Sequence, residues 1–289
     1  MSESVLELVD DRSRLVIAAA NGGGIARFDA LVPGRAPVPL LKPARADAVG
    51  CELLVPWSNR ISGGGFDFDG RFHPVEPNVP GEPFPLHGDG FQKPWRVARQ
   101  TAAEAELVLD DGSIGPYRYA ARVVYALREG ALDATLTVEN RASIRLPDGL
   151  GFHPWFPRHA GTSLTATASR VWLEDERHLP TGVEPVAAHP AWDFSQGAPL
   201  PAGWINNGFD GWDRRATIVQ PEDGVALSLE ASPELGVFIV YSPAADAGFF
   251  CFEPVSHPVD AHHGEGLTAL EPGASMTASM RLAWQGIEA

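Results

Sequence analysis

Hydrophobic residues along this chain recur in short runs, and glycine or proline interrupts most of them. Residues 119–140 contain two runs rich in β-branched and aromatic side chains, which predicts a hairpin with Gly130 in its turn. Residues 224–242 show the same arrangement around Pro233, and residues 275–284 alternate small or polar with larger apolar side chains, as a half-buried strand does. No segment keeps a helical period over the roughly 10–12 residues that would indicate a helix.

This pattern predicts an all-β protein, with one large antiparallel β-sandwich that spans residues 1–289 as a single domain. The chain has 289 residues, which is ample for one large core and exceeds the length of an ordinary sandwich, so we expect extra strands and long loops. The proline-rich stretch from 72 to 95 is one such loop, and loops of that length inside compact domains are often functional.

Charge narrows the range of partners. Lys and Arg number 22 against 37 Asp and Glu, for a formal charge of −15, which disfavours binding to nucleic acid or to an anionic membrane surface. No apolar run is long enough to span a bilayer, and the first residues lack the pattern of a signal peptide. We therefore expect a cytoplasmic protein. Its two cysteines, Cys51 and Cys251, lie among apolar residues and are expected to be buried, reduced thiols, with a single bridge as the alternative.

Four islands concentrate polar groups among aromatic residues and glycines. Arg60 has the donors to anchor hydroxyls or a carboxylate, or it pairs with a surface acid. His87 lies on a loop that a ligand can approach closely, or it is a turn histidine bonded to a carbonyl. Glu253 follows an apolar strand pattern, where it is either a half-desolvated base or a solvated strand end. The islands are Asn59 and Arg60 in 55–71, His87 in 85–91, His153 in 146–159, and Glu253 in 248–266.

His153 stands among Phe152, Trp155 and Phe156, where a lone imidazole needs a partner. It is a hydrogen-bonded core residue, a metal ligand, or a titrating group beside a flat substrate. The histidines lack the spacings of known metal motifs, so we expect no metal. Neither a nucleophile elbow nor a phosphate-binding loop is present. One histidine, one carboxylate, an arginine, amides and aromatic rings suit a neutral, polyhydroxylated ligand.

Taken in order, the islands resemble the aldose 1-epimerase (galactose mutarotase) family, and in particular its shorter bacterial members. The resemblance covers essentially the whole chain and implies the fold of that family, a galactose mutarotase-like β-supersandwich. The residues that carry it are NRI at 59–61, LHGDGF at 86–91, GFHPWF at 151–156, NNGFDGW at 206–212 and EPVSHPVDA at 253–261.

Carried over position by position, the resemblance implies that His153 is the catalytic acid and Glu253 the catalytic base. Arg60 and His87 would hold sugar hydroxyls and the ring oxygen, with Asn59 supporting the first loop and Trp155 offering an aromatic face. Asn206 or Asp210 stands where some members have a hydroxyl-binding aspartate. An amide both donates and accepts where a carboxylate only accepts, so this departure affects which sugar is preferred.

The implied reaction interconverts the α and β anomers of a free aldose by ring opening and reclosure, without a cofactor. We expect Glu253 to keep the pKa of His153 near neutrality, against the effect of its apolar surroundings. The expected partner is a monosaccharide, and the expected assembly is a monomer or a homodimer. Three alternatives remain open: a phosphosugar 1-epimerase, a lyase or isomerase acting on a sugar acid, and a non-catalytic carbohydrate-binding protein.

Overall fold

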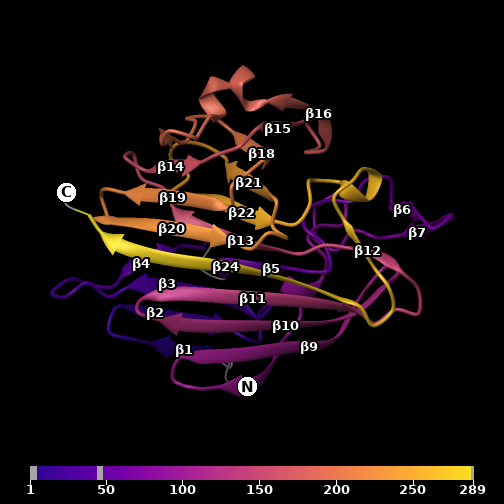
Figure 1. The fold of residues 1–289 in the computed structure, drawn as a ribbon, viewed down its shortest axis with the longest axis horizontal. Helices are drawn as coiled ribbons and strands as arrows, with labels where there is room; N and C mark the ends of the chain where they lie inside the picture. Colours follow the sequence, from indigo (N-terminus) through magenta and orange to yellow (C-terminus); the bar gives the residue numbers. More distant parts are fainter. Residues whose placement is uncertain (1–4, 44–47, 288–289) are drawn as a thin grey trace.

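The computed structural model describes residues 5–43 and 48–287. Two large sheets, of eleven and nine strands, make up most of this part of the chain, and every strand pair in them is antiparallel. Figure 1 shows strands of the nine-stranded sheet lying across strands β1–β4 of the larger one. The large antiparallel β-sandwich that the sequence predicts is therefore confirmed. Within the described ranges, no helix has the length and apolarity that a bilayer crossing demands.

The eleven-stranded sheet carries both the N-terminal strands and the segments around His153 and Glu253. Its order is β1-β2-β3-β5-β13-β22-β21-β18-β15-β16, and β4 pairs with β3 off this path. The strands are β1 (Val5–Val9), β2 (Ser13–Ala18), β3 (Gly24–Ala30), β4 (Val38–Leu41), β5 (Cys51–Leu54), β13 (Gly151–Pro157), β15 (Arg170–Glu174), β16 (Pro180–Pro185), β18 (Ile205–Asp210), β21 (Val237–Ser242) and β22 (Phe249–Val255).

The nine-stranded sheet has the order β17-β14-β19-β20-β24-β11-β10-β9-β8, and two small two-stranded sheets lie beside the large ones. Its strands are β8 (Arg96–Gln100), β9 (Glu104–Ile114), β10 (Tyr117–Arg128), β11 (Ala131–Asn140), β14 (Ser163–Ala166), β17 (Ala198–Pro199), β19 (Arg215–Gln220), β20 (Val225–Ala231) and β24 (Ser275–Gly286). The small sheets pair β6 (Gly65–Phe68) with β7 (Arg71–Pro74) and β12 (Leu146–Asp148) with β23 (Thr268–Leu270). Short 3₁₀ helices lie at η1 (Gly90–Gln92), η2 (Val186–Ala188), η3 (Pro190–Trp192) and η4 (Ala261–His263).

The main core lies between the two large sheets. On β10, buried and more exposed side chains alternate along most of the strand, because successive side chains of a strand point to opposite faces. Tyr125 on this strand is fully buried and donates a hydrogen bond from its hydroxyl to the carbonyl of Gly23, 2.8 Å away, beside the larger sheet. Trp284 of β24 likewise donates to the hydroxyl of Ser13 on β2, at 2.8 Å. These bonds join the two sheets across an apolar interior.

The predicted strands are confirmed, but one of the two predicted hairpin connections is wrong. The hairpin in 119–140 is confirmed: β10 pairs with β11, and Gly130 lies in the turn at a φ of 80°. The strand in 275–284 is confirmed as part of β24. The hairpin around Pro233 is wrong, because β20 belongs to the nine-stranded sheet and β21 to the larger one. The chain crosses between sheets there, since each strand finds its partners elsewhere.

One buried carboxylate in the fold has no partner. Asp148, at the end of β12, is 1% exposed, and neither of its oxygens has a hydrogen-bond partner among the described residues. Burial raises the pKa of Asp148 to about 8, because the charged form is poorly solvated there. An acid whose pKa is higher in the folded than in the unfolded chain stabilises the fold at low pH, and this contribution is lost as the pH rises toward the folded pKa.

We therefore predict that Asp148→Asn flattens the pH dependence of stability between about pH 4 and pH 8. In the unchanged protein this group lowers the free energy of unfolding by up to about 1.4 kcal/mol per pH unit in that range. Urea denaturation at several pH values measures the slope. Asp67→Asn, at an exposed position on β6, is the matched control and should leave the slope unchanged. Equal slopes in all three proteins would contradict the prediction.

Candidate active site

The pairing of β13 with β22 brings His153 and Glu253 together. The register that pairs Gly151 with Val255 and Trp155 with Cys251 places His153 opposite Glu253. The His153 Nε2 atom lies 3.3 Å from Oε1 of Glu253, and both side chains are buried. Two residues about 100 positions apart in sequence thus form one polar pair in the middle of the larger sheet.

The strand alternation separates the aromatic residues around His153 into two groups. Phe152 and Phe156 are fully buried members of the main core between the sheets. Trp155 lies on the opposite face, the same face as His153, and the two rings stack with centroids 5.0 Å apart. The expectation that all three aromatic residues surround the imidazole is therefore wrong for both phenylalanines, because odd and even positions of a strand point to opposite sides.

The pair lines a cavity of about 380 Å³ on the outer face of the larger sheet. His87, His153 and Glu253, which we expected to share one cleft, all line it. So do the predicted residues Asn59, Arg60, Trp155 and Asn206. The other lining residues are Glu52, Val79, Glu82, Leu86, Phe91, His178, Trp204 and Tyr241.

Burial works against charge on both members of the pair. It lowers the pKa of His153 to about 4. The pKa of Glu253 is raised well above its usual range, first by burial and then by the negative charge of Glu52, while Arg60 acts in the opposite direction. Our expectation that Glu253 would hold the pKa of His153 near neutrality is wrong. Desolvation dominates, and a carboxyl that itself favours its neutral form has little charge to offer its neighbour.

A second carboxylate lies on the other side of His153. The register of β5 with β13 pairs Glu52 with His153 directly, so one row across three strands reads Glu52, His153, Glu253. Glu52 also lines the cavity. Its negative charge raises the pKa of Glu253, which ties the proton affinity of the pair to a third strand.

Two loops form one wall of the cavity and hold each other in place. The backbone N–H of His87 donates to the carbonyl of Asn59, and the N–H of Asn59 donates to Nδ1 of His87, both at 2.9 Å. Because Nδ1 accepts a hydrogen bond, the neutral ring carries its proton on Nε2 and offers that N–H as a donor. Burial, followed by the charges of His153 and Arg60, lowers the pKa of His87, which keeps this ring neutral.

Arg60 lines the cavity beside these loops and supplies a positive charge. Its Nη2 lies 3.1 Å from Oε2 of Glu82, and its Nη1 donates to Oδ1 of Asn59 at 3.3 Å. The side chain is 11% exposed, and its Nε has no partner among the described residues. Arg60 therefore pairs with an acid, as one of our two interpretations held, and still has an unused donor.

The same wall is anchored from beneath by His257. Its Nε2 accepts a hydrogen bond from the N–H of Ser58 at 3.1 Å, and its Nδ1 lies 2.8 Å from the carbonyl of Pro258. Burial lowers the pKa of His257 to about 4, which keeps Nε2 free to accept. A Cβ on Gly149 would come within 2.2 Å of this ring, so only glycine leaves room for it. The first loop is thereby tied to the chain that leaves β22.

Aromatic rings form another wall of the cavity, which runs outward from His153. Trp155 contacts Tyr241 edge to face at 6.3 Å between centroids, and Tyr241 contacts Trp204 in the same way at 5.3 Å. Trp204 in turn stacks on His178 at 5.1 Å and is 46% exposed. This wall offers ring faces and edges to the C–H groups of a ligand.

Glu174, at the end of β15, holds the far part of that wall. One of its oxygens accepts from Nε1 of Trp204 at 2.9 Å. The other accepts from Nδ2 of Asn206 at 2.8 Å and lies 3.1 Å from Nδ1 of His178. A single carboxylate thus positions three side chains that line the cavity, which fixes how Asn206 presents its amide.

Asp210 is placed elsewhere. It is not among the residues that line the cavity; its carboxylate binds the guanidinium of Arg170 at 2.8 Å and the indole N–H of Trp172 at 3.0 Å. Of the two candidates for the hydroxyl-binding position, the structure brings Asn206 to the cavity and leaves Asp210 in a pair at the end of β18.

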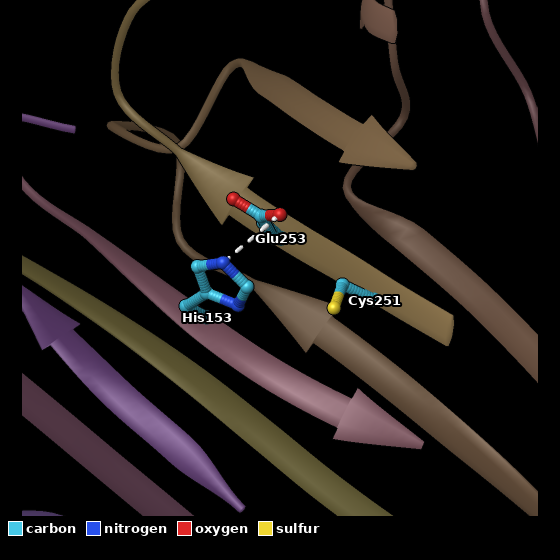
Figure 2. A group of neighbouring side chains, drawn as sticks. All are labelled: His153, Cys251 and Glu253. Carbon is cyan, nitrogen blue, oxygen red and sulfur yellow. Dashed lines mark ion pairs between the residues drawn. The ribbon is translucent and has the colours of Figure 1, made fainter. Parts of the chain in front are cut away.

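Both cysteines are free and buried, as predicted. Cys251 lies two residues before Glu253 on β22, with its sulfur beside the His153–Glu253 pair (Figure 2). Among the described residues, this sulfur, a His153 ring nitrogen and a Glu253 oxygen form one group of potential metal ligands, all within 4.8 Å of one another.

Sequence reasoning missed Glu52, Glu174, His178 and Trp204. Trp204 had a usable signal, because it lies two residues before Asn206 and therefore on the same face of an extended segment. No signal in the sequence pointed to Glu52 or Glu174, because their neighbours in space come from strands far away in the chain.

A β-sandwich of this size with such a cavity defines the class of galactose mutarotase-like folds, and comparisons with known proteins support this. Residues 4–283 match the family model described as aldose 1-epimerase. The uncharacterized Escherichia coli K12 protein YphB is 39% identical over 257 residues, covering 84% of this chain and 88% of that protein. The chain belongs to the aldose 1-epimerase family.

Solved structures agree. A provisionally described aldose 1-epimerase from Escherichia coli K12 has a TM-score of 0.91 and 34% identity, covering 98% of this chain and 99% of that one. A galactose mutarotase-like protein from Clostridium acetobutylicum has a TM-score of 0.85 at 18% identity, covering 98% and 95%, and this similarity concerns the fold alone.

We predict that Glu174→Gln weakens sugar binding about 10-fold, or about 1.4 kcal/mol. A glutamine has one acceptor oxygen, so it cannot satisfy both the Trp204 side and the Asn206 side of this group. Isothermal titration with galactose, glucose, xylose and arabinose measures the change.

Glu184→Gln is a matched control for this variant. Glu184 lies outside the cavity lining and holds His189 at 2.7 Å, and His189 stacks on Trp192, much as His178 stacks on Trp204. It should bind sugar as the unchanged protein does. Unaltered affinity in the folded Glu174 variant would show that the sugar does not depend on this wall.

Proposed function

We propose that this protein interconverts the α and β anomers of a free aldose, with Glu253 as general base and His153 as general acid. The observation that carries the proposal is the buried His153–Glu253 pair, 3.3 Å apart, on the surface of a cavity large enough for a sugar. A general acid and a general base that both reach one ring are what reversible opening of a cyclic hemiacetal requires.

The proposed reaction has two proton transfers in each direction. The Glu253 carboxylate removes the proton from the hydroxyl on C1, a carbonyl forms at C1, and the bond from C1 to the ring oxygen breaks. The ring oxygen takes the proton of the His153 imidazolium as it leaves. Rotation about the C1–C2 bond turns the other face of the aldehyde toward the hydroxyl, and reclosure reverses both transfers, so the enzyme ends in its starting protonation state.

The pair needs one proton to work, and either member can carry it. Burial favours the form in which the proton lies on Glu253 and both groups are neutral. The reactive form has the same net charge, with the proton moved to His153. Arg60 favours the ionised state of Glu253, so it assists this shift. The proton can pass directly from Glu253 to His153 across their 3.3 Å contact, so the shift requires no exchange with solvent.

The remaining cavity residues suit a neutral sugar. The Nε2–H of His87 and the unused donor of Arg60 can bind hydroxyl oxygens, Asn206 can bind them from the opposite wall, and Trp155 can pack against C–H groups. Besides the His153–Glu253 pair, two carboxylates, Glu52 and Glu82, face this space against one arginine that already pairs with Glu82. Such a cavity repels a phosphate group, which favours a free aldose over a phosphosugar.

We predict that Glu253→Gln lowers the rate of anomer exchange at least about 100-fold while sugar affinity changes little, because a positioned base contributes roughly 10²–10⁴-fold. Proton NMR exchange spectroscopy with glucose, galactose, xylose and arabinose measures the rate, and titration of the same sugars measures affinity.

The control is Asp223→Asn, which alters another carboxylate paired with a histidine: Asp223 lies 2.8 Å from His159, outside the cavity lining. This variant should exchange anomers at the unchanged rate. If the folded Glu253 variant keeps most of its activity, Glu253 is not the base. If no free aldose is accelerated by the unchanged protein but sugars still bind, a non-catalytic binding role replaces the proposal.

A further inference from the structure

Cys251 is a buried thiol that the proposed reaction does not use, and it lies against the catalytic pair. Its sulfur, a ring nitrogen of His153 and a carboxylate oxygen of Glu253 all lie within 4.8 Å of one another, and all three residues are buried. Figure 2 shows Cys251 and Glu253 extending from the same strand, with the imidazole of His153 beside them on its neighbour.

The sheet geometry explains why the sulfur lies on this side. Cys251 and Glu253 are two residues apart on β22, so their side chains share one face. Cys251 is paired in register with Trp155 and Tyr241, and both of these rings line the cavity above it. The sulfur therefore lies beneath the aromatic part of the cavity floor.

The other cysteine lies on the opposite face of the sheet. Cys51 is a member of the main core between the sheets, whereas its neighbour Glu52 lines the cavity. Both thiols are free and fully buried. The two cysteines are thus equally buried but lie on opposite sides of the sheet. A substitution of Cys51 therefore serves as a control for the same substitution of Cys251.

Two polar atoms in this group lack partners. Nδ1 of His153 and Oε2 of Glu253 have no hydrogen-bond partner among the described residues, although the two residues are only 7% and 3% exposed. Leaving buried polar atoms unpaired is costly, so both are available to a ligand that can reach them.

The charges of the cavity favour a cation as that ligand. Glu52 and Glu253 both line it, and the negative charge of Glu52 opposes ionisation of Glu253. Arg60, the arginine of the lining, already pairs with Glu82. A divalent cation bound to Glu253 would relieve the repulsion between the Glu52 and Glu253 carboxylates. It would also form an ion pair with the Glu253 carboxylate, whose charge is otherwise poorly solvated.

We propose that Cys251, His153 and Glu253 form a binding site for Zn²⁺, with the fourth position open toward the cavity. Thiolate, imidazole and carboxylate together are typical zinc ligands, and they favour Zn²⁺ over Mg²⁺ or Ca²⁺. On binding, the zinc–sulfur bond replaces the S–H bond and the zinc–oxygen bond replaces the O–H bond of the Glu253 carboxyl, so two protons leave to the buffer. The ligand atoms would close to about 3.3–3.8 Å from one another, as a tetrahedral zinc ion requires.

This site would make zinc an inhibitor of the protein. A zinc ion bound to Glu253 takes up the carboxylate charge that the general base needs, and it lies where the C1 hydroxyl of a sugar would sit. Zinc and sugar therefore compete. The inhibition rests on the proposed function, whereas the binding site does not.

The first test measures binding without any activity assay. Co²⁺ is titrated into the purified full-length protein, since a cobalt–thiolate bond gives a charge-transfer band in the near ultraviolet. The unchanged protein and Cys51→Ser should show this band at one cobalt per chain, and added Zn²⁺ should abolish it. Cys251→Ser should lack the band and bind Zn²⁺ at least about 10-fold more weakly.

Cys251→Ala serves as a second variant, and circular dichroism confirms that each variant is folded. The proposal is overturned if cobalt gives no band with the unchanged protein, if the band depends on Cys51, or if both folded Cys251 variants bind Zn²⁺ as tightly as the unchanged protein.

The second test measures anomer exchange with and without Zn²⁺, each variant being compared with its own metal-free rate. Zinc should slow the unchanged protein and Cys51→Ser, with a KM that rises with zinc concentration, and should slow Cys251→Ser at least about 10-fold less effectively. Equal sensitivity of all three would refute inhibition through this site. If no variant exchanges anomers, the proposed function fails, and the cobalt spectrum still decides whether the metal site exists.

Discussion

The pairing of β13 with β22 is the constraint on which the rest of this site depends. Side chains of a strand alternate between faces, so one residue of slippage would move His153 into the apolar core and bring a phenylalanine to the cavity. Phe152 and Phe156 on one strand and Phe250 and Phe252 on the other are buried in that core, and they make any such slip expensive. The packing that stabilises the sandwich is therefore also what aligns His153 with Glu253.

The buried polar groups of the cavity make the folded state less stable than an apolar lining would. His153 and Glu253 are buried with one unpaired polar atom each, and desolvation opposes charge on both. A hydrophobic pair at these positions would pack with less cost. The surrounding loops compensate by satisfying their own polar groups, as the two hydrogen bonds between Asn59 and His87 show. The same unpaired atoms serve both proposals, the sugar site and the metal site.

The proposed hydroxyl-binding wall and the proposed acid–base pair belong to different parts of the sheet. Glu174 organises Asn206, Trp204 and His178 at the outer strands, whereas the His153–Glu253 pair lies on central ones. The two regions share the cavity but no hydrogen bond among those in the described residues. Such a separation would let the proposed hydroxyl-binding wall change without disturbing the His153–Glu253 pair.

Local pattern was enough to predict the β class, the hairpin at Gly130 and the last strand, because alternation and turn residues are properties of neighbouring positions. It failed at Pro233, where two good strands with a short connection belong to different sheets. Seven of the eight predicted site residues line the cavity, whereas Asp210 lies outside the lining and pairs with Arg170.

The sequence by itself thus determined which segments become strands and which residues have the chemistry for a sugar site. Only the tertiary structure decided that Glu52 and Glu253 flank His153, that Cys251 lies on the cavity side of the sheet while Cys51 lies in the core, and that Glu174 organises the far wall. The physical reason is that strand pairing joins residues about 100 positions apart. Register, which sets the face of every side chain, depends on how whole sheets pack and not on any local run of residues.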